Sequence, residues 1–346
     1  MDIQPPYYTY KTYLTQKYGT SAYRIGVDGG FSCPNRNADG LGGCTYCDDT
    51  GAVAVYHRQK EAADARKSYQ EDSTGAEAAS YYQNQTLSER KEYIKNQTEK
   101  AVKFLGSRYK AELYLLYFQA FSGTYDEPAV LRELYDYALS LMEFKELIVS
   151  TRPDCLDAEK INLLSSYREK VADVWVELGL QSSINTTLDR INRGHTAEQF
   201  VEIFHLLREN GIKISAHLIL GLPGESYEEI SRTAELITEL HPEAVKIHNL
   251  HIPDNTQMLT EYSQGELLVP STARHLSYTA YLLERITDDI IIQRLTCDTP
   301  SHRLAAPRLF KKKGAFISQL GKMMNTHKQY QGRCFKERCL QEGENA

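Results

Sequence analysis

The sequence lacks the features that would place the protein in a membrane or outside the cell. No apolar run among its 346 residues approaches the roughly 20 residues that a membrane helix requires. The N-terminal stretch MDIQPPYYTYKTYL has no apolar block behind a basic start, so we expect no secretory signal. We therefore predict a cytoplasmic protein that has no membrane partner.

Cysteine is scarce and odd in number, which argues against a disulfide framework. The chain has seven cysteines, and the cytosol keeps thiols reduced. Three of them, Cys33, Cys44 and Cys47, lie within fifteen residues, whereas the other four are scattered or near the C-terminus. This clustering indicates metal ligation.

An excess of positive charge is also missing from the chain as a whole. The formal net charge is −6, which argues against a protein that coats nucleic acid over its whole surface. Basic residues are nevertheless concentrated at 303–338, which holds ten Lys or Arg and one acid, Glu337. This stretch is either a solvated basic tail or a phosphate-binding surface.

Short apolar segments alternate with amphipathic ones along most of the chain, without an obvious linker or internal repeat. We predict strands over 23–27, 111–121, 146–150, 174–178, 212–220, 244–250 and 290–295. Helices are predicted between them over 127–143, 157–169, 186–192, 197–210, 226–240 and 270–287. The alternation is typical of parallel βαβ units. It fits both a doubly wound sheet and a partial (β/α) barrel, and in either fold ligands gather at the carboxyl ends of the strands.

One segment does not follow this alternation. Residues 57–100 are rich in Gln, Glu, Lys and Ser and have few aliphatic residues. We interpret them as a polar insertion, helical or partly disordered, that buries little surface.

The cysteines lie on a loop that is rich in glycine. Cys44 and Cys47 form a CxxC pair, and Cys33 lies eleven residues before it. Three thiolates on such a loop suit a [4Fe-4S] cluster whose fourth iron has no protein ligand. Free thiols, or a zinc site completed by Asp48 or His57, remain alternatives at this point.

Several blocks of sequence together resemble one family. They are GGFSCPNR and GGCTYC in the cysteine loop, then YFQAFSGTY, STRPDCL, VELGLQS, INRGH, HLILGLPGE and KIHNLHI in that order. The chain resembles radical S-adenosylmethionine (SAM) proteins of the YhcC/YtqA type, relatives of the Elongator catalytic subunit. The resemblance implies an α/β fold, a partial (β/α)6 TIM-like radical SAM barrel over 1–302. The polar insertion at 57–100 lies within it, and a basic C-terminal extension follows at 303–346.

The resemblance also implies the cofactors. Cys33, Cys44 and Cys47 would hold a [4Fe-4S] cluster, whose open iron SAM would chelate. A one-electron donor of the flavodoxin or ferredoxin type would reduce the cluster, and SAM would then yield a 5′-deoxyadenosyl radical.

Two strand ends hold candidate SAM-binding residues. The backbone at Gln119 and Ala120 would accept from the SAM ammonium, unless this is an ordinary strand end. Glu177 is a carboxylate in an apolar strand, which is costly unless it is paired. Together with Gln181 it would bind the ribose hydroxyls or the ammonium of SAM; a structural arginine is the alternative partner.

Arg193 is the candidate partner of the SAM carboxylate, because related enzymes have an arginine there and a guanidinium suits a bidentate contact. The alternative is a surface salt bridge. The turn containing Gly221 and Leu222 has little side-chain bulk, so its backbone can approach adenine, although a generic turn looks the same. Arg152 and Asp154 also follow a strand and are weaker candidates.

The remaining candidates are single residues. Cys297 follows the last predicted strand and is a possible catalytic hydrogen donor, with a buried inert thiol as the default interpretation. His217, His248 and His251 are interpreted as hydrogen-bonded core residues. A second metal site on Cys334, Cys339 and His327 is a further, weaker hypothesis.

The resemblance suggests that the enzyme modifies the wobble uridine of tRNA. It would convert a 5-carboxymethylaminomethyl group to 5-aminomethyl, with tRNA phosphates held by the basic 303–338 segment. Two alternatives remain: a radical SAM enzyme that acts on a protein or small molecule, and a non-catalytic zinc-binding module that recognises RNA.

Overall fold

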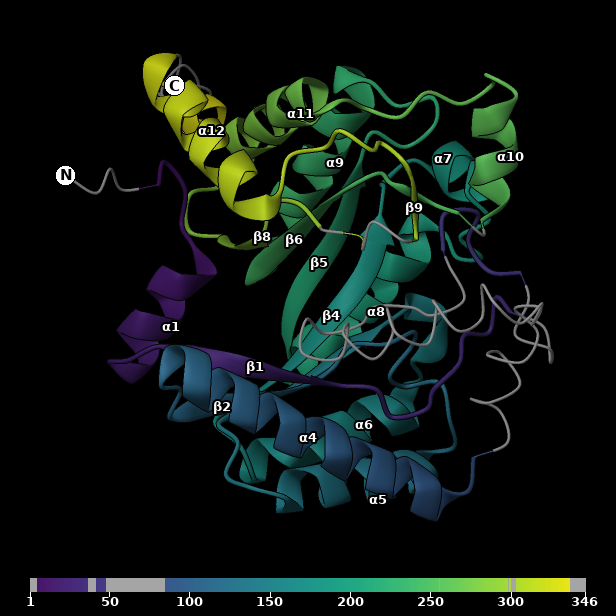
Figure 1. Ribbon diagram of the computed structural model, residues 1–346, viewed down its shortest axis with the longest axis vertical. Helices are drawn as coiled ribbons and strands as arrows, with labels where there is room; N and C mark the ends of the chain where they lie inside the picture. Colours follow the sequence, from purple (N-terminus) through teal and green to yellow (C-terminus); the bar gives the residue numbers. More distant parts are fainter. Residues whose placement is uncertain are drawn as a thin grey trace. The chain divides into compact units, whose positions relative to one another are not determined.

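Figure 1 shows the computed structural model, which describes residues 5–36, 42–47, 85–254, 256–297, 299 and 303–336. Within these ranges, no helix is long and apolar enough to cross a membrane. The chain divides into two compact units. The cysteine unit comprises Leu14–Gly179 and Asn192–Ile214, and the C-terminal unit comprises Met1–Tyr13, Leu180–Ile191 and Ser215–Ala346.

The cysteine unit is built on parallel strands that follow the order of the sequence. They are β1 (Ala22–Val27), β2 (Leu113–Phe118), β3 (Glu146–Thr151) and β4 (Asp173–Gln181), whose last two residues belong to the C-terminal unit. Residues of β2, β3 and β4 are buried almost continuously, as expected for parallel strands covered on both faces. The helices of this unit are α4 (Leu87–Tyr109), α5 (Pro128–Ser140), α6 (Ala158–Ser166) and α8 (Ala197–Glu209), and α1 (Tyr10–Tyr18) crosses into it.

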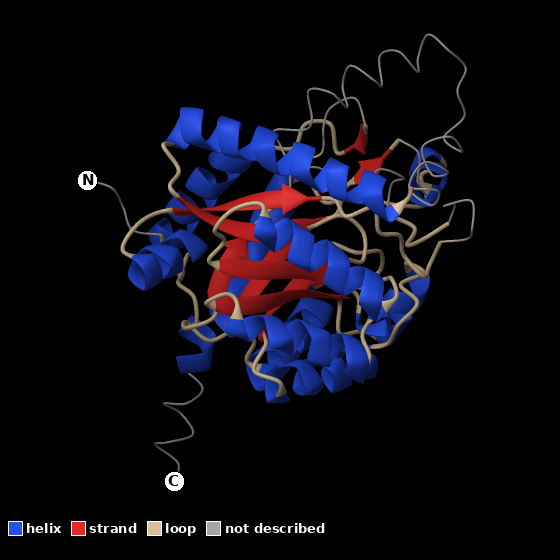
Figure 2. Ribbon diagram, turned by 90° about the horizontal axis from the view of Figure 1, so that it is seen from below, coloured by secondary structure: helices blue, strands red, loops and turns tan. Residues whose placement is uncertain are grey.

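The C-terminal unit contains the parallel strands β5 (Lys213–Leu220), β6 (Ala244–Asn249) and β8 (Ile291–Arg294), again in sequence order; the first two residues of β5 belong to the cysteine unit. Its helices are α7 (Asn185–Arg190), α9 (Tyr227–Leu240), α10 (Gln257–Ser263), α11 (Thr272–Arg285) and α12 (Lys313–Thr326). A short antiparallel pair joins β7 (Ile252–Pro253) to β9 (Leu304–Ala306). Helices flank the strands of both units (Figure 2).

Strand order decides between the two folds that periodicity left open. A doubly wound sheet reverses its strand order at a switch point, but within each unit neighbouring strands follow the sequence. Sequential parallel strands with helices between them are the arrangement of a (β/α) barrel. The predicted α/β barrel-type fold is therefore the one observed.

The predicted elements are all present, with ends shifted by a few residues. The strand predicted over 111–121 is shorter at both ends and spans Leu113–Phe118. The strand cannot extend to residue 121, because Phe121 adopts a left-handed conformation, with φ of 49°. Such a residue cannot continue a strand.

Helix α4 corrects part of the interpretation of 57–100. The helix begins after a capping box formed by Thr86 and Glu89 and buries Arg90, Ile94 and Gln97. The expectation that this segment buries little surface is therefore wrong from Leu87 onward, where it is helical; residues 57–84 lie outside the described part of the chain. The polar composition suggested an exposed segment. However, the buried positions of this helix include charged and amide side chains, which are satisfied by hydrogen-bonding partners.

The basic C-terminal segment is partly folded. Helix α12 packs against α11 and buries Phe316, Leu320 and Met324. Its described residues, 303–336, belong to the same compact unit as β5, β6 and β8. The division into a barrel over 1–302 and an extension over 303–346 stays a prediction.

Candidate active site

Helix α4 holds the beginning of the cysteine loop. The Arg90 guanidinium donates to the Gly29 carbonyl at 2.7 Å and pairs with Asp126 at 2.7 Å. Gln97 makes two hydrogen bonds of 2.9 Å with the backbone N–H and carbonyl of Asp28. These contacts place Gly30, with φ of 70°, at the turn into the loop. No sequence pattern pointed to Arg90 or Gln97, because both lie in the segment interpreted as an insertion.

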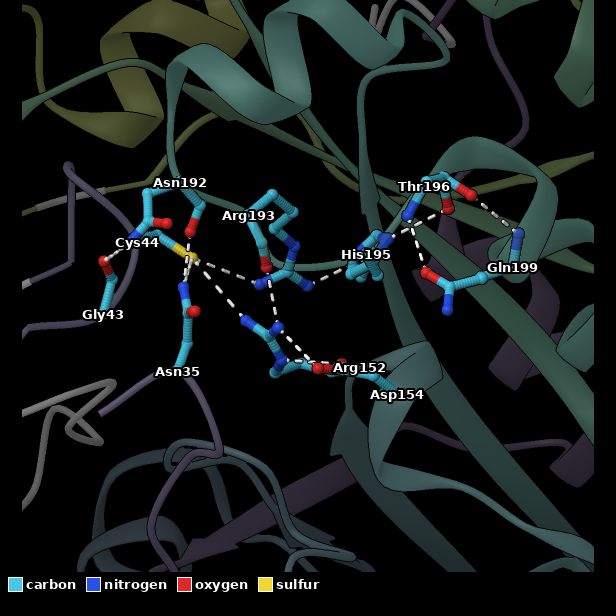
Figure 3. Close-up of polar contacts among 11 residues, drawn as sticks. Asn35, Gly43, Cys44, Arg152, Asp154, Asn192, Arg193, His195, Thr196 and Gln199 are labelled. Atoms are coloured by element: carbon cyan, nitrogen blue, oxygen red, sulfur yellow. Dashed lines mark hydrogen bonds and ion pairs between the residues drawn. The ribbon is translucent and has the colours of Figure 1, made fainter. Parts of the chain in front are cut away.

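Cys44 is surrounded by N–H donors (Figure 3). Its sulfur lies 3.6 Å from Arg193 Nη1, 3.7 Å from Arg152 Nη1 and 3.8 Å from Asn35 Nδ2. Cys44 is 7% exposed, and both arginines are buried as well. Two buried guanidinium groups at one sulfur favour its anionic form, and Asp154 balances only one of the two charges.

The electrostatics of Cys44 agree with this geometry. Burial raises the pKa of the thiol, but the charges of Arg193 and Arg152 together with hydrogen bonds from Arg193 and Tyr46 lower it further, so the pKa lies below its ordinary value. Cys155 contrasts with it, because burial raises its pKa to about 11. The thiolate is the form that ligates metals, and the fold favours it at Cys44.

Asn192 and Asn35 hold the end of the cysteine loop. Asn192 Nδ2 donates to the Gly43 carbonyl at 2.8 Å, and the Asn192 carbonyl accepts from Asn35 Nδ2. Asn192 has a φ of 50°, which asparagine tolerates better than most residues. The INRGH block therefore contributes Asn192, which fixes the loop by hydrogen bonds, in addition to the arginine predicted there.

Cys47 and Cys33 complete the predicted ligand set. Arg36 Nη2 lies 3.5 Å from the Cys47 sulfur, and both Cys33 and Cys47 are partly exposed. Within the described residues, no three Cys, His, Asp or Glu side chains already converge as a metal site. Ligation by the three cysteines stays a prediction, supported by the donors at Cys44 and Cys47. Asp48 and His57, the zinc alternatives, lie outside the described residues.

Arg152 is more deeply built into the site than its sequence context suggested. It forms a two-bond pair with Asp154, at 2.8 and 2.7 Å, and donates to the Arg193 carbonyl at 2.7 Å. A side chain added at Gly194 would lie 3.0 Å from Arg152 Nη2. Arg152 thus ties together Asp154, the Arg193 backbone and the Cys44 sulfur.

Arg193 retains an unused donor. Its Nη2 donates to the Gly179 carbonyl at 2.9 Å, whereas its Nε is buried without a hydrogen-bond partner in the described structure. A buried N–H without an acceptor is costly, and a ligand carboxylate would satisfy it. Burial, helped by the Arg193 charge, lowers the pKa of His195 to about 3. Neutral His195 therefore donates to only one of the two carbonyls beside its ring, those of Gly179 and Thr196.

Glu177 has two partners inside the cysteine unit. Its carboxylate accepts from Arg24 Nη1 and from the Tyr117 hydroxyl, each at 2.5 Å. The structural arginine that the sequence left open is therefore present, and these contacts favour it over a SAM ligand. The pairing joins residues 153 positions apart in sequence, so no local pattern indicated it.

The end of β2 turns sharply at the other predicted SAM segment. Gln119 covers Gly26, where an added Cβ would lie 2.8 Å from the Gln119 side chain. Ala120 is buried, and Phe121 turns the backbone through its positive φ. A turn of this kind presents backbone groups at the strand end, as the predicted contact with the SAM ammonium requires.

The other predicted SAM residues lie in the C-terminal unit. Gln181 has a φ of 72°, a strained value for a residue other than glycine. Gly221 has a φ of 88°, and a Cβ there would lie 2.2 Å from Pro270, so only glycine fits this turn. Gly221 and Leu222 line a cavity of about 930 Å³. The cavity also contains Glu225, whose pKa burial raises to about 7.

Cys297 lies just beyond the end of β8 and is not an isolated thiol. Its sulfur is 3.1 Å from His251 Nδ1 and 3.4 Å from Asn249 Oδ1. Asn249 Oδ1 also accepts from the Cys297 backbone N–H at 3.0 Å. The hydrogen-donor role of Cys297 stays a prediction. So does the second metal site, because Cys339 lies outside the described residues.

Comparison with known proteins places this geometry in a family. The model of the Radical SAM superfamily matches residues 33–237, and that of the Radical_SAM C-terminal domain matches 242–326. Protein YhcC of Escherichia coli (strain K12) is 30% identical over 315 residues, which cover 91% of each chain. The tRNA uridine(34) acetyltransferase of Methanocaldococcus infernus is 27% identical over 201 residues, 57% of this chain and 36% of that protein.

A solved structure shares the fold. The archaeal Methanocaldococcus infernus Elp3, with an N-terminal deletion, superposes with a TM-score of 0.60 at 21% identity. The match covers 69% of this chain and 60% of that one. The predicted partial barrel of the radical SAM type and the predicted resemblance to the YhcC/YtqA type are both confirmed.

The cofactors follow from the same comparison. Radical SAM proteins use a [4Fe-4S] cluster and S-adenosyl-L-methionine, so the predicted cofactor pair is confirmed at the level of the family. Residues of this chain fit both groups, with N–H donors around the Cys44 sulfur and an unsatisfied Nε on Arg193. The family model begins at the first cysteine of the loop and extends over more than half of the chain, which therefore belongs to the radical SAM superfamily.

Proposed function

We propose that this protein is a radical SAM enzyme that converts 5-carboxymethylaminomethyluridine to 5-aminomethyluridine at the wobble position of tRNA. The observation that carries the tRNA substrate is an exposed basic loop at 308–313, beside a folded helix. The likeness to a tRNA uridine(34) acetyltransferase supports it, since that relative is named for the same nucleotide.

The basic loop is the part of the 303–338 segment that suits RNA phosphates. Arg308 and Lys311–Lys313 are exposed, and Leu309 between them is 97% exposed. Lys313 is also the first residue of helix α12, which anchors the loop through its buried face. Arg333 and Lys336 are different, because they pair with Glu284 and Asp288. Phosphate binding is therefore assigned to the loop rather than to the whole segment.

The proposed chemistry divides between the cofactors and the chain. When bound, the cluster and SAM would supply a 5′-deoxyadenosyl radical that can take a hydrogen atom from the carboxymethyl carbon. The substrate then loses one further electron to a one-electron acceptor, and water releases the two-carbon unit as an aldehyde acid. In total the substrate gains one water and gives up two electrons and two protons, leaving the amine.

In this scheme the residues of the cysteine unit hold the cluster and orient SAM. Cys33, Cys44 and Cys47 would ligate three irons, while Arg152 and Asn35 donate to the Cys44 sulfur. Arg193 would pair its free Nε with the SAM carboxylate. The one-electron donor, of the flavodoxin or ferredoxin type, remains a prediction.

Nucleoside analysis tests the substrate. Bulk tRNA from a deletion strain should accumulate 5-carboxymethylaminomethyluridine and lose 5-aminomethyluridine and nucleosides made from it. Purified holoenzyme with SAM and a reductant should restore the aminomethyl form in that tRNA. Unchanged wobble nucleosides in the deletion strain would contradict the proposed substrate.

Salt dependence tests the basic loop. Replacing Lys311, Lys312 and Lys313 by Gln should reduce the slope of log K against log salt for tRNA by about 0.7 to 0.9 per lost phosphate contact. The matched control replaces three surface lysines of the cysteine unit, Lys91, Lys145 and Lys170 (each in a surface ion pair). Equal slopes for the two triple variants would refute the assignment of the loop.

A further inference from the structure

Basic side chains gather on neighbouring strands of the C-terminal unit, at positions that the proposed function has not used. In the parallel register, His217 on β5 lies opposite Lys246 on β6, and Lys246 lies opposite Arg294 on β8. His248 follows two residues after Lys246, on the same face of β6. The rings of His217 and His248 are 5.7 Å apart.

Two of these groups have unused hydrogen-bonding capacity. The Nε2 atom of His248 is buried and has no hydrogen-bond partner in the described part of the chain. Arg294 is half-buried, and no hydrogen bond or ion pair of its guanidinium occurs among the described residues. The Arg294 guanidinium has five N–H donors, so it can bind an acceptor group from a ligand.

The groups that lower the pKa of His248 after burial are basic side chains. The pKa of His248 lies well below its ordinary value, first because of burial and then because of Arg294, His217, Lys246 and His251. All four of these neighbours are basic. His251 is in contact with Cys297, and Lys246 is only 4% exposed. Burial therefore keeps His248 neutral, and the Arg294 guanidinium beside it supplies a positive charge that a bound anion would balance.

We propose that Arg294 and His248, with Lys246 beside them, bind the carboxylate of the substrate. The identity of that carboxylate, the carboxymethylamino group of the modified uridine, rests on the proposed function. An arginine binds a planar carboxylate through two parallel hydrogen bonds. The carboxylate is bonded to the carbon that loses hydrogen. Binding the carboxylate therefore also fixes the position of that carbon.

Carboxylate binding would also let the enzyme discriminate between substrate and product. The product retains the amine but has lost the carboxylate, so it would leave Arg294 and His248 without an acceptor. A site that loses a partner for its buried polar groups discriminates strongly against the ligand that lacks it. The same contact therefore favours substrate binding and product release.

A binding experiment without turnover tests the site. Two anticodon stem-loop RNAs are compared, one with 5-carboxymethylaminomethyluridine and one with 5-aminomethyluridine, on SAM-loaded enzyme without a reductant. The wild-type protein should bind the first RNA roughly tenfold more tightly or better. Arg294→Gln should abolish this preference and leave the affinity for the second RNA unchanged, while Arg294→Lys should retain part of it. The control Arg232→Gln, an exposed pair on α9, should keep the full preference.

Each other outcome is decisive. Equal wild-type affinity for the two RNAs overturns the carboxylate site, as does a preference that survives Arg294→Gln. Loss of affinity for both RNAs in Arg294→Gln would assign Arg294 to a phosphate. If the preference is present but holoenzyme with reductant forms no aminomethyl product, the proposed function fails while the site stands.

A second measurement needs no RNA. N-methylglycine, the carboxymethylamino group cut free, is titrated into the protein while the imidazole resonances are followed by NMR, with His248→Gln used for assignment. The His248 signal should shift saturably in the wild type and in Arg232→Gln, but not in Arg294→Gln. A His248 signal that is insensitive to this probe in the folded wild-type protein would overturn the site.

Discussion

Replacing Glu177 by Gln distinguishes the structural role of this carboxylate from a role in SAM binding. The Glu177 side chain is fully buried, and that of its partner Arg24 is 19% exposed. Breaking a buried ion pair by removing one partner costs about 3–5 kcal/mol. Because Arg24 retains some contact with water and Gln can still accept from Tyr117, we expect the lower end, about 3 kcal/mol of unfolding free energy.

The chain contains its own probe for this measurement. Trp175, the single tryptophan, is fully buried on β4, the strand that carries Glu177. Urea unfolding of the apoprotein, followed by Trp175 fluorescence, should show a clearly lower midpoint for Glu177→Gln. Glu143→Gln is the control, since the Glu143 side chain is 79% exposed in its pair with Lys145 and its loss should leave the midpoint unchanged.

SAM affinity completes the test. Glu177→Gln should bind SAM as tightly as the wild type when the cluster is loaded and no denaturant is present. Adding Arg24→Gln to Glu177→Gln should cost less than the sum of the two single changes, because the second change removes the uncompensated cation. An unchanged unfolding midpoint together with lost SAM binding would refute the structural role.

Two further substitutions test other parts of the site. Arg152→Gln removes a cation and an N–H donor from the Cys44 sulfur, so the cluster should become harder to reduce. Its midpoint potential in an EPR-monitored titration should become more negative, whereas Arg232→Gln should not move it; an unchanged potential at full iron content would contradict the assignment. Gly221→Ala introduces a clash and a strained φ, so it should destabilise the protein by roughly 1–3 kcal/mol in thermal unfolding. Gly106→Ala, in a helix with open space around it, should be neutral or stabilising.

Local pattern alone determined the order of strands and helices and the cysteine loop. Strands such as β2 and β4 are buried on both faces, so they appear in the sequence as continuous apolar runs. The three cysteines are recognisable because their spacing is a local property. Element ends were less well determined where a single backbone conformation decides them, as at Phe121.

Only the tertiary structure decided which side chains act together. Arg24 reaches Glu177, Arg152 reaches the Cys44 sulfur, and Arg90 holds the loop at Gly29, all across long separations in sequence. Spacing along a chain contains no distances between elements that the fold brings together. Burial supplies the remaining reason, because it turns these charged groups from solvated surface residues into partners that stabilise one another.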